Sequence, residues 1–277
     1  MPTTAEKRRT FRKLHEAGCF VIPNPWSAGT AKYLQRLGFK ALASTSAGFA
    51  HFDGMADGAV PRDLMLTHVA ELAAATDLPV NADFEAGYAH DPAGVAESVR
   101  LCVETGVAGL SIEDSTGDPQ KPLYDLDDAL ARLRAARAAI DKSGGDVLLT
   151  GRAECFLVRH PDALNESIRR LVAYAAAGAD CLYAPGLRKR EEIAAVVQAV
   201  APKPVNLLIG FASELTVKDI SELGVRRISV GSALARTAWG AFAKTAAEIA
   251  EKGRFDGFAG IPTTADLNKL FGEDREH

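Results

Sequence analysis

Acidic side chains follow one apolar run of this sequence closely enough to hold a metal ion. Leu78-Pro79-Val80 is typical of a buried strand, and Asn81-Ala82-Asp83-Phe84-Glu85-Ala86-Gly87-Tyr88 follows it directly. If the chain stays extended, Asp83 and Glu85 point to the same side, because side chains alternate along a strand. Two carboxylates at the end of a strand, followed by a glycine, suit a divalent cation.

Further carboxylates follow the neighbouring apolar runs. Asp57 lies in the long segment 45–58, Glu113 follows Ser111-Ile112, and Glu154 follows Gly151-Arg152-Ala153. Oxygen ligands without a cluster of His or Cys suit Mg²⁺ or Mn²⁺ rather than zinc. Because Mg²⁺ binds one or two carboxylates directly and keeps waters, we expect Asp57, Glu85 and Glu113 to act through water. The alternative for each acid is a helix cap or an ion pair with a nearby arginine.

Three features could bind an anionic substrate. Arg152 directly follows a strand, and its planar guanidinium could bind a carboxylate or phosphonate; the alternative is a structural ion pair with Glu154 or Glu113. Thr45-Ser46-Ala47-Gly48 has small side chains, so backbone N–H groups could approach an anionic oxygen, although alone it is an ordinary turn. Asn206, near the end of a strand, could donate to the same anion or be satisfied by backbone groups.

Short apolar runs alternate with longer amphipathic segments along the whole chain. The predicted strands cover 19–23, 40–44, 79–83, 108–112, 146–150, 180–183, 203–207 and 226–230. The predicted helices cover 28–37, 61–75, 91–104, 126–141, 161–176, 188–200, 215–222 and 232–252, and an extra N-terminal helix with a capping box at Thr3 runs to about His15. Eight such units favour a single (β/α)₈ TIM-type barrel over a doubly wound open sheet. The barrel would occupy 1–277, with 232–277 as a C-terminal helical extension.

The barrel explains why the candidate residues belong together. Residues that follow the strands of a parallel barrel meet at its C-terminal face, where the chemistry of this fold is found. We therefore expect the carboxylates, Arg152 and the small residues at 45–48 to share one barrel mouth.

Composition excludes several functions. A net charge of −4 over 277 residues leaves no basic surface for nucleic acid, and no stretch approaches the ~20 apolar residues of a membrane span. The basic N-terminus is not followed by the apolar segment of a signal peptide, and the four cysteines are scattered. We therefore expect a cytoplasmic protein with reduced thiols and a small-molecule partner, without nucleic-acid or membrane partners.

At these residues the chain resembles the isocitrate lyase/phosphoenolpyruvate mutase superfamily over nearly its whole length. The similarity is carried jointly by Asn24-Pro25-Trp26-Ser27-Ala28-Gly29, Thr45-Ser46-Ala47-Gly48, Asp83-Phe84-Glu85-Ala86-Gly87-Tyr88, Ser111-Ile112-Glu113-Asp114, Arg152-Ala153-Glu154 and Val230-Gly231-Ser232-Ala233-Leu234. The resemblance implies a Mg²⁺-dependent barrel that makes or breaks a C–C or P–C bond next to a 2-oxo acid through an enolate. It implies Asp83 as the direct metal ligand and Asp57, Glu85 and Glu113 as water-linked ligands.

The same resemblance assigns the remaining roles. Ser46, Ala47 and Gly48 would bind the carboxylate of the oxo acid, with Thr45 beside them. Arg152 would lie on the anionic side of the substrate, and Arg152 and Glu113 are the candidate catalytic residues. A long C-terminal helix is often exchanged between subunits in this family, which implies a homo-oligomer, a dimer or a tetramer.

One loop departs from the family pattern. The family's lyases carry a Lys-Lys-Cys-Gly motif after strand four, whereas here the segment reads Ser115-Thr116-Gly117-Asp118-Pro119-Gln120-Lys121-Pro122-Leu123-Tyr124. The first hypothesis is therefore a lyase acting on a small 2-oxo or 2-hydroxy (di)carboxylate, with oxaloacetate decarboxylation as the simplest case. The alternatives are a P–C bond mutase or hydrolase acting on a phosphonopyruvate-type substrate, and a metal-binding barrel without catalysis.

Overall fold

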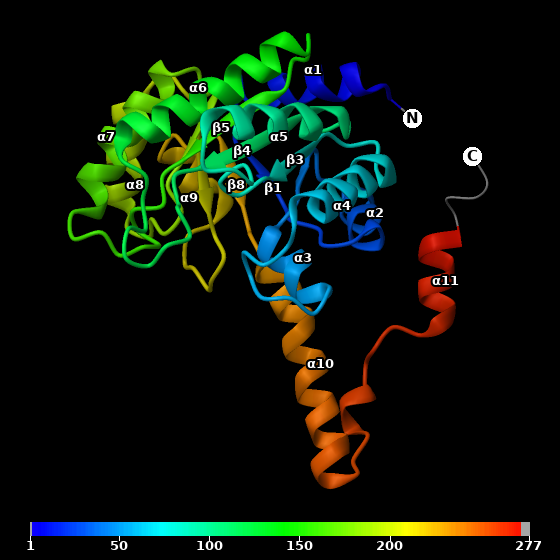
Figure 1. Ribbon diagram of the computed structural model, residues 1–277. Helices are drawn as coiled ribbons and strands as arrows, with labels where there is room; N and C mark the ends of the chain where they lie inside the picture. Colours follow the sequence, from blue (N-terminus) through cyan, green and yellow to red (C-terminus); the bar gives the residue numbers. More distant parts are fainter. Residues whose placement is uncertain (1, 273–277) are drawn as a thin grey trace.

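A curled parallel sheet forms the centre of the protein in the computed structural model, which describes residues 2–272 (Figure 1). Its eight strands are β1 (Phe20–Ile22), β2 (Leu42–Ala43), β3 (Val80–Asp83), β4 (Gly109–Glu113), β5 (Leu148–Arg152), β6 (Cys181–Tyr183), β7 (Val205–Leu208) and β8 (Arg227–Ser229). β1 pairs with β8, and the Ala43 N–H donates to the Pro23 carbonyl at 3.1 Å, which links the two ends of the strand order. The predicted (β/α)₈ barrel is confirmed, and the open sheet is excluded.

Helices connect and cover the strands. They are α1 (Thr4–Leu14), α2 (Ala28–Arg36), α3 (Ser46–Phe52), α4 (Arg62–Ala75), α5 (Pro92–Glu104), α6 (Leu126–Lys142), α7 (Ala163–Ala176), α8 (Arg190–Val200), α9 (Val217–Glu222), α10 (Ala233–Lys252), the 3₁₀ turn η1 (Asp256–Phe258) and α11 (Thr264–Gly272). The predicted elements are present with bounds within two residues. The capping box is also confirmed, since Glu6 N–H donates to Thr3 Oγ1 at 3.2 Å and Thr3 N–H to Glu6 Oε2 at 2.7 Å. α3 is the exception, because it lies in the segment 45–58 that was expected to be a loop.

α1 closes the barrel at the N-terminal ends of the strands. Phe11 is fully buried and packs with residues that open β5 and β6, Leu148 and Cys181. His15, which ends α1, donates from Nδ1 to the Phe11 carbonyl at 2.8 Å. Its Nε2 therefore accepts from Nη1 of Arg227, 3.3 Å away inside the barrel. The lower end of the barrel is thus filled by this helix.

His15 predicts a pH dependence of stability. Burial, and then the charge of Arg227, lower the pKa of His15 from 6.5 to about 3. Between pH 6.5 and 3 the unfolded chain binds a proton at His15 that the folded chain does not. The contribution of neutral His15 to the free energy of unfolding is therefore complete above pH 6.5 and is lost as the pH falls toward 3. Each pH unit in the window is worth up to about 1.4 kcal/mol. We expect the difference in unfolding free energy between wild type and His15→Gln, measured in urea, to shrink between pH 7 and about 4.5; a constant difference would contradict this reason.

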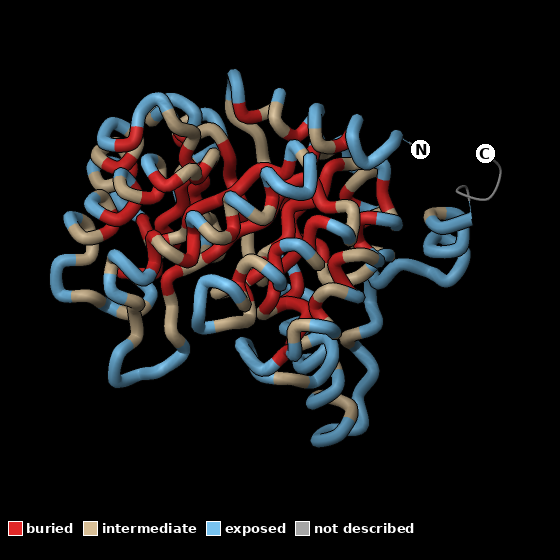
Figure 2. Tube along the Cα trace, turned by 45° about the horizontal axis from the view of Figure 1, so that its top comes forward, coloured by how far each residue is buried: buried red, intermediate tan, exposed pale blue. Residues whose placement is uncertain are grey.

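The C-terminal segment leaves the barrel. α10 projects away from it, and α11 folds back without packing on the strands (Figure 1). Only Ala235 of α10 is buried, and the segment is almost uniformly exposed (Figure 2). Its large exposed hydrophobic side chains are Leu234, Trp239, Phe242, Phe255, Phe258, Ile261, Leu267 and Phe271. No helix within residues 2–272 is long and apolar enough to cross a membrane.

Candidate functional site

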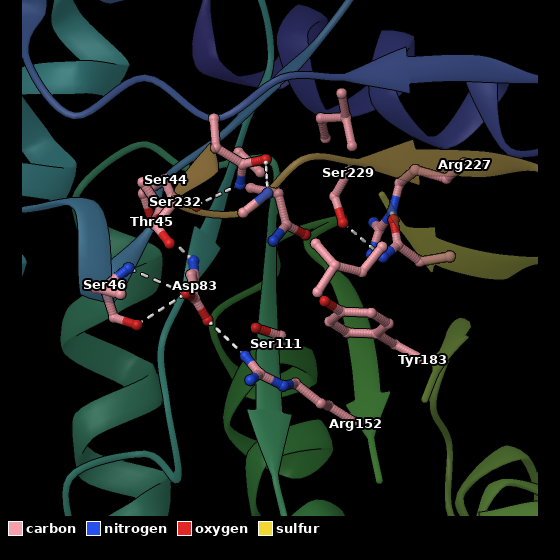
Figure 3. Close-up of a pocket in the computed structure, with 18 of the residues that line it drawn as sticks. Ser44, Thr45, Ser46, Asp83, Ser111, Arg152, Tyr183, Arg227, Ser229 and Ser232 are labelled. Atoms are coloured by element: carbon pink, nitrogen blue, oxygen red, sulfur yellow. Dashed lines mark hydrogen bonds and ion pairs between the residues drawn. The ribbon is translucent and has the colours of Figure 1, made fainter. Parts of the chain in front are cut away.

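A polar pocket of about 160 Å³ opens at the C-terminal face of the barrel and reaches down between the strands (Figure 3). Of the residues predicted from the sequence, it brings together Thr45, Ser46, Ala47, Asp57, Asp83, Arg152 and Asn206. Strand register explains this convergence: Asp83 pairs with Ser111 of β4, and Ser111 pairs with Thr150 of β5, so inward-facing residues line up across the strands. The expectation of one shared mouth is met for these seven residues.

Asp83 ends β3 and is fixed from two sides. Its Oδ2 accepts from the Ser46 N–H at 3.0 Å and from Ser46 Oγ at 2.9 Å, and its Oδ1 accepts from Nη1 of Arg152 at 3.1 Å (Figure 3). The Asp83 N–H donates to Ser44 Oγ at 2.8 Å. The carboxylate is therefore oriented into the pocket before any ligand binds.

Arg152 ends β5 and is surrounded by carboxylates. Its Nη1 lies 3.1 Å from both Asp83 and Glu113, and its Nε lies 2.5 Å from Glu154. Although burial lowers the pKa of Arg152, Glu113, Glu154 and Asp83 raise it well above its usual value, so it stays charged. The ion pairs to Glu154 and Glu113, which were the alternative to substrate binding by Arg152, are both present, and Arg152 also pairs with Asp83.

Glu113 and Glu85 line a second hollow beside the main pocket, together with Tyr88 and Tyr124. Burial first, and then neighbouring carboxylates, raise the pKa of Glu113 and that of Glu85, the latter to about 7. Burial and then Asp83 likewise raise the pKa of Asp57. Burial thus disfavours the charged forms of these acids, and the nearby carboxylates add to that effect.

The expectation that Asp83 and Glu85 share one strand face is wrong. β3 ends at Asp83, and Glu85 has a left-handed φ of 47°. The turn is held by Arg132 of α6, which donates to the carbonyls of Ala86, Ala89 (2.6 Å) and His90 (2.5 Å). Extended geometry therefore stops before Glu85, and its side chain leaves the main pocket.

Asp114 supports this arrangement from behind. Its Oδ1 accepts from the Glu154 N–H at 2.8 Å, and its Oδ2 accepts from Arg170 Nη1 at 3.0 Å and from the Tyr174 hydroxyl at 2.6 Å. Its side chain is 1% exposed and that of Arg170 7%. The pair fixes the backbone of Glu154, which in turn bonds Arg152.

The donor set fits a hard divalent cation. Oε1 of Glu85 is buried without a hydrogen-bond partner, and burial, followed by neighbouring carboxylates, raises the pKa values of Glu85, Glu113 and Asp57. Among residues 2–272, however, no three His, Cys, Asp or Glu side chains are grouped closely enough to hold a metal by themselves. One direct carboxylate with water-linked neighbours is the arrangement that suits Mg²⁺.

The segment Thr45–Gly48 is a helix start rather than a turn. Thr45 caps α3, and its Oγ1 accepts from the Gly48 N–H at 3.2 Å. A Cβ at Gly48 would lie 2.5 Å from Cγ2 of Thr45, so only glycine fits beneath the cap. The N–H groups of Ser46 and Gly48 were expected to face an anion, but they already donate to Asp83 and to Thr45 within the chain.

Asn206 and Lys121 both have side-chain partners within the protein. Asn206 is buried, but side chains rather than backbone satisfy it: it donates to Ser229 Oγ at 2.9 Å and accepts from Nε of Arg227 at 2.8 Å. Lys121 bonds Asp125 at 2.6 Å and is 58% exposed. The loop after β4 closes on itself, with Ser115 bridged to Leu123.

Asn24 and Arg227 are among the pocket residues that were not predicted. Asn24 joins three strand ends: its amide donates to the Ser44 carbonyl at 2.8 Å, and its Oδ1 accepts from the N–H groups of Val230 and Gly231, both at 2.9 Å. Arg227 lines the floor of the pocket. Its position within the predicted strand 226–230, where a charged side chain is unusual, was the available signal for it.

The protein is a TIM barrel with acids and an arginine at the C-terminal ends of its strands, which is where TIM-barrel enzymes carry their active sites. The chain belongs to the phosphoenolpyruvate phosphomutase family, whose profile matches residues 11–250. The resemblance to the isocitrate lyase/phosphoenolpyruvate mutase superfamily is thereby confirmed.

Individual relatives agree on this class. Oxaloacetate decarboxylase of Paraburkholderia xenovorans is 30% identical over 244 residues, covering 84% of this chain and 77% of the relative. A crystal structure from Burkholderia cenocepacia J2315, provisionally described as a lyase/mutase, superposes with a TM-score of 0.93 at 46% identity over 97% of this chain and 96% of the other. Oxaloacetate acetylhydrolase bound to its product oxalate gives 0.86 at 27% identity, covering 100% and 98%.

A more distant structure shares the fold. Phosphonopyruvate hydrolase, solved with oxalate and Mg²⁺, superposes with a TM-score of 0.86 at 23% identity, over 97% of this chain and 96% of the other. The activities named for the decarboxylase and the acetylhydrolase both concern oxaloacetate, whereas the hydrolase at 23% identity adds only the shared fold. The chain is a family member of the lyase and mutase type.

Proposed function

We propose that this protein is a Mg²⁺- or Mn²⁺-dependent lyase that breaks a C–C bond in a small 2-oxo or 2-hydroxy carboxylate through an enolate. Oxaloacetate decarboxylation is the simplest reaction of this kind. The observation that carries the proposal is the Asp83 carboxylate, held between Ser46 and Arg152 in a polar pocket at the barrel mouth. The named activity of the Paraburkholderia relative supports the choice of substrate.

Each residue then has a role. Asp83 would ligate the cation directly, and Asp57, Glu85 and Glu113 would bind its waters. When bound, the cation would act as a Lewis acid on the oxo and carboxylate oxygens and would stabilise the enolate.

The protein's own groups would position the substrate. Of the candidate carboxylate-binding segment Thr45–Gly48, the Ser46 and Gly48 N–H groups already have partners, so Ala47 N–H and the Thr45 backbone are the parts that would face the substrate. Asn206 lines the opposite side. Arg152 and Glu113, 3.1 Å apart, would lie on the reacting side, where the guanidinium neutralises developing negative charge.

The test measures pyruvate released from oxaloacetate, with Mg²⁺ or with excess EDTA. We expect release at least about a hundredfold above the rate with an equal amount of inactive Asp83→Ala protein and the same Mg²⁺. This control matters because free metal ions also promote the reaction. Equal rates with wild type and Asp83→Ala would contradict the proposal.

A P–C bond reaction on the same site is the second candidate, favoured by the family to which the chain belongs. Phosphorus NMR on phosphonopyruvate would detect it directly. The family resemblance implies a lysine and an asparagine on the loop after strand four in the mutase and hydrolase branch, and Lys121 is the one lysine between Ser115 and Tyr124.

Lys121→Ala separates the two candidates. Because Lys121 is exposed and pairs with Asp125, we expect the variant to retain kcat/KM for oxaloacetate within about twofold. A loss of more than tenfold would show that this loop rearranges to deliver the lysine. Calorimetry addresses the third candidate, since binding of neither Mg²⁺ nor oxalate would favour a barrel without catalysis.

We also propose that the segment 232–277 is exchanged between subunits of a homo-oligomer. Residues 273–277 lie outside the described part of the chain. The exposed Trp239 and Phe242 pack edge to face at 5.4 Å on α10 and are otherwise uncovered in the single chain. Light scattering should show a dimer or tetramer, and a monomer at micromolar concentration would contradict the exchange.

A further inference from the structure

The floor of the pocket holds a cation that has no anionic partner. Arg227 begins β8, points into the barrel and is 3% exposed. Its partners are all neutral: Nε donates to Asn206 Oδ1 at 2.8 Å, Nη2 to Thr150 Oγ1 at 3.0 Å, and Nη1 to His15 Nε2 at 3.3 Å. Within residues 2–272 no carboxylate forms an ion pair with it.

The contrast with Arg152 is informative because both arginines line the same pocket (Figure 3). Arg152 is surrounded by Asp83, Glu113 and Glu154, whereas Arg227 faces polar groups without charge. A buried ion without a counter-ion costs several kcal/mol even after relaxation. No carboxylate within residues 2–272 therefore pairs with the charge of Arg227.

Arg227 also keeps hydrogen-bonding capacity. A guanidinium has five N–H donors, and three are used, so one N–H remains on each terminal nitrogen. His15 cannot replace an anion, since it is neutral and serves as an acceptor. Asn206 and Thr150 hold the guanidinium in place from β7 and β5. This is a rigid, preorganised donor pair beside a cavity.

We propose that Arg227 binds a carboxylate of the substrate on the floor of the pocket, and that the substrate is a small dicarboxylate with its other carboxylate at the mouth beside Asp83. The planar fork of arginine matches a carboxylate, and the pocket volume of about 160 Å³ limits the ligand to a short-chain acid. This inference rests on the proposed function only in taking the pocket as the substrate site.

The test is calorimetry with malonate as the probe, in excess EDTA and at constant ionic strength, so that no metal takes part. Wild type is expected to bind malonate, and malonamide, its neutral analogue, is expected not to bind. Arg227→Gln should weaken binding at least tenfold, and Arg227→Lys should weaken it less. The matched control is Arg226→Gln, which removes the same charge from a neighbour whose Nη1 bonds the Gly18 carbonyl outside the pocket and is expected to leave Kd unchanged.

Each possible result supports or overturns the proposed role of Arg227. Equal losses in Arg226→Gln and Arg227→Gln, or no loss in Arg227→Gln, would overturn the inference. If Arg227→Gln does not fold, the wild-type Tm decides: a rise with malonate beyond that with sodium chloride supports the site, and no rise overturns it. Malonate binding without any turnover of oxaloacetate would contradict the proposed function and leave the anion site standing.

Discussion

Asp83→Asn is expected to lower kcat/KM for oxaloacetate decarboxylation by at least about 10²–10³-fold and to abolish measurable Mg²⁺ binding. The amide keeps the size of the carboxylate and can still accept from Ser46, so the fold should persist. It removes the negative charge that faces Arg152 at 3.1 Å and that would ligate the cation. Kinetics over a range of Mg²⁺ concentrations, with calorimetry of Mg²⁺ binding, measure both effects.

Asp53→Asn is the matched control for this prediction. Asp53 is an exposed acid that ends α3, close in sequence to the site but outside the residues that line the pocket. Its replacement should leave kcat/KM within about twofold of wild type. If both variants lose activity equally, a general effect of surface charge explains the result, and Asp83 is not the metal ligand.

Asp114→Ala is expected to lower the free energy of unfolding by about 3–5 kcal/mol, the usual result of removing one partner of a buried ion pair. The substitution leaves the Tyr174 hydroxyl and the Glu154 N–H without their acceptor and leaves Arg170 with Glu166 and the Tyr124 carbonyl only. Urea unfolding monitored by circular dichroism measures the loss. Because Glu154 would no longer be fixed against Arg152, the folded fraction should also lose activity.

Asp125→Asn provides the comparison for stability. Asp125 pairs with Lys121 at 2.6 Å, but both side chains are exposed and solvent screens the pair, so we expect no measurable change in the free energy of unfolding. A loss below about 1 kcal/mol for Asp114→Ala would show that water or a neighbouring side chain replaces the carboxylate. The buried network would then not position Glu154.

Local chemistry is enough to predict most of the fold. Thr3 and Glu6 specify the start of α1 by their own hydrogen bonds. Four helices are each followed by a glycine in the left-handed conformation that glycine adopts easily at a helix end. These are Gly38, Gly106, Gly178 and Gly224, with φ of 84°, 89°, 104° and 88°. These signals depend only on neighbours in sequence. α3 was missed because its seven residues, Ser46–Phe52, are small or aromatic and carry no helical pattern of apolar positions.

The sequence by itself determined the strand-end positions of Asp83, Glu113 and Arg152, because in a parallel barrel the order of the elements already places strand ends on one face. Only the tertiary structure decided which side chains share a pocket. Glu85 turns away because its backbone is left-handed, and Arg227 enters because the register of β8 directs it inward beside Asn206. Register and backbone handedness come from contacts between residues far apart in the chain, which no local spacing records.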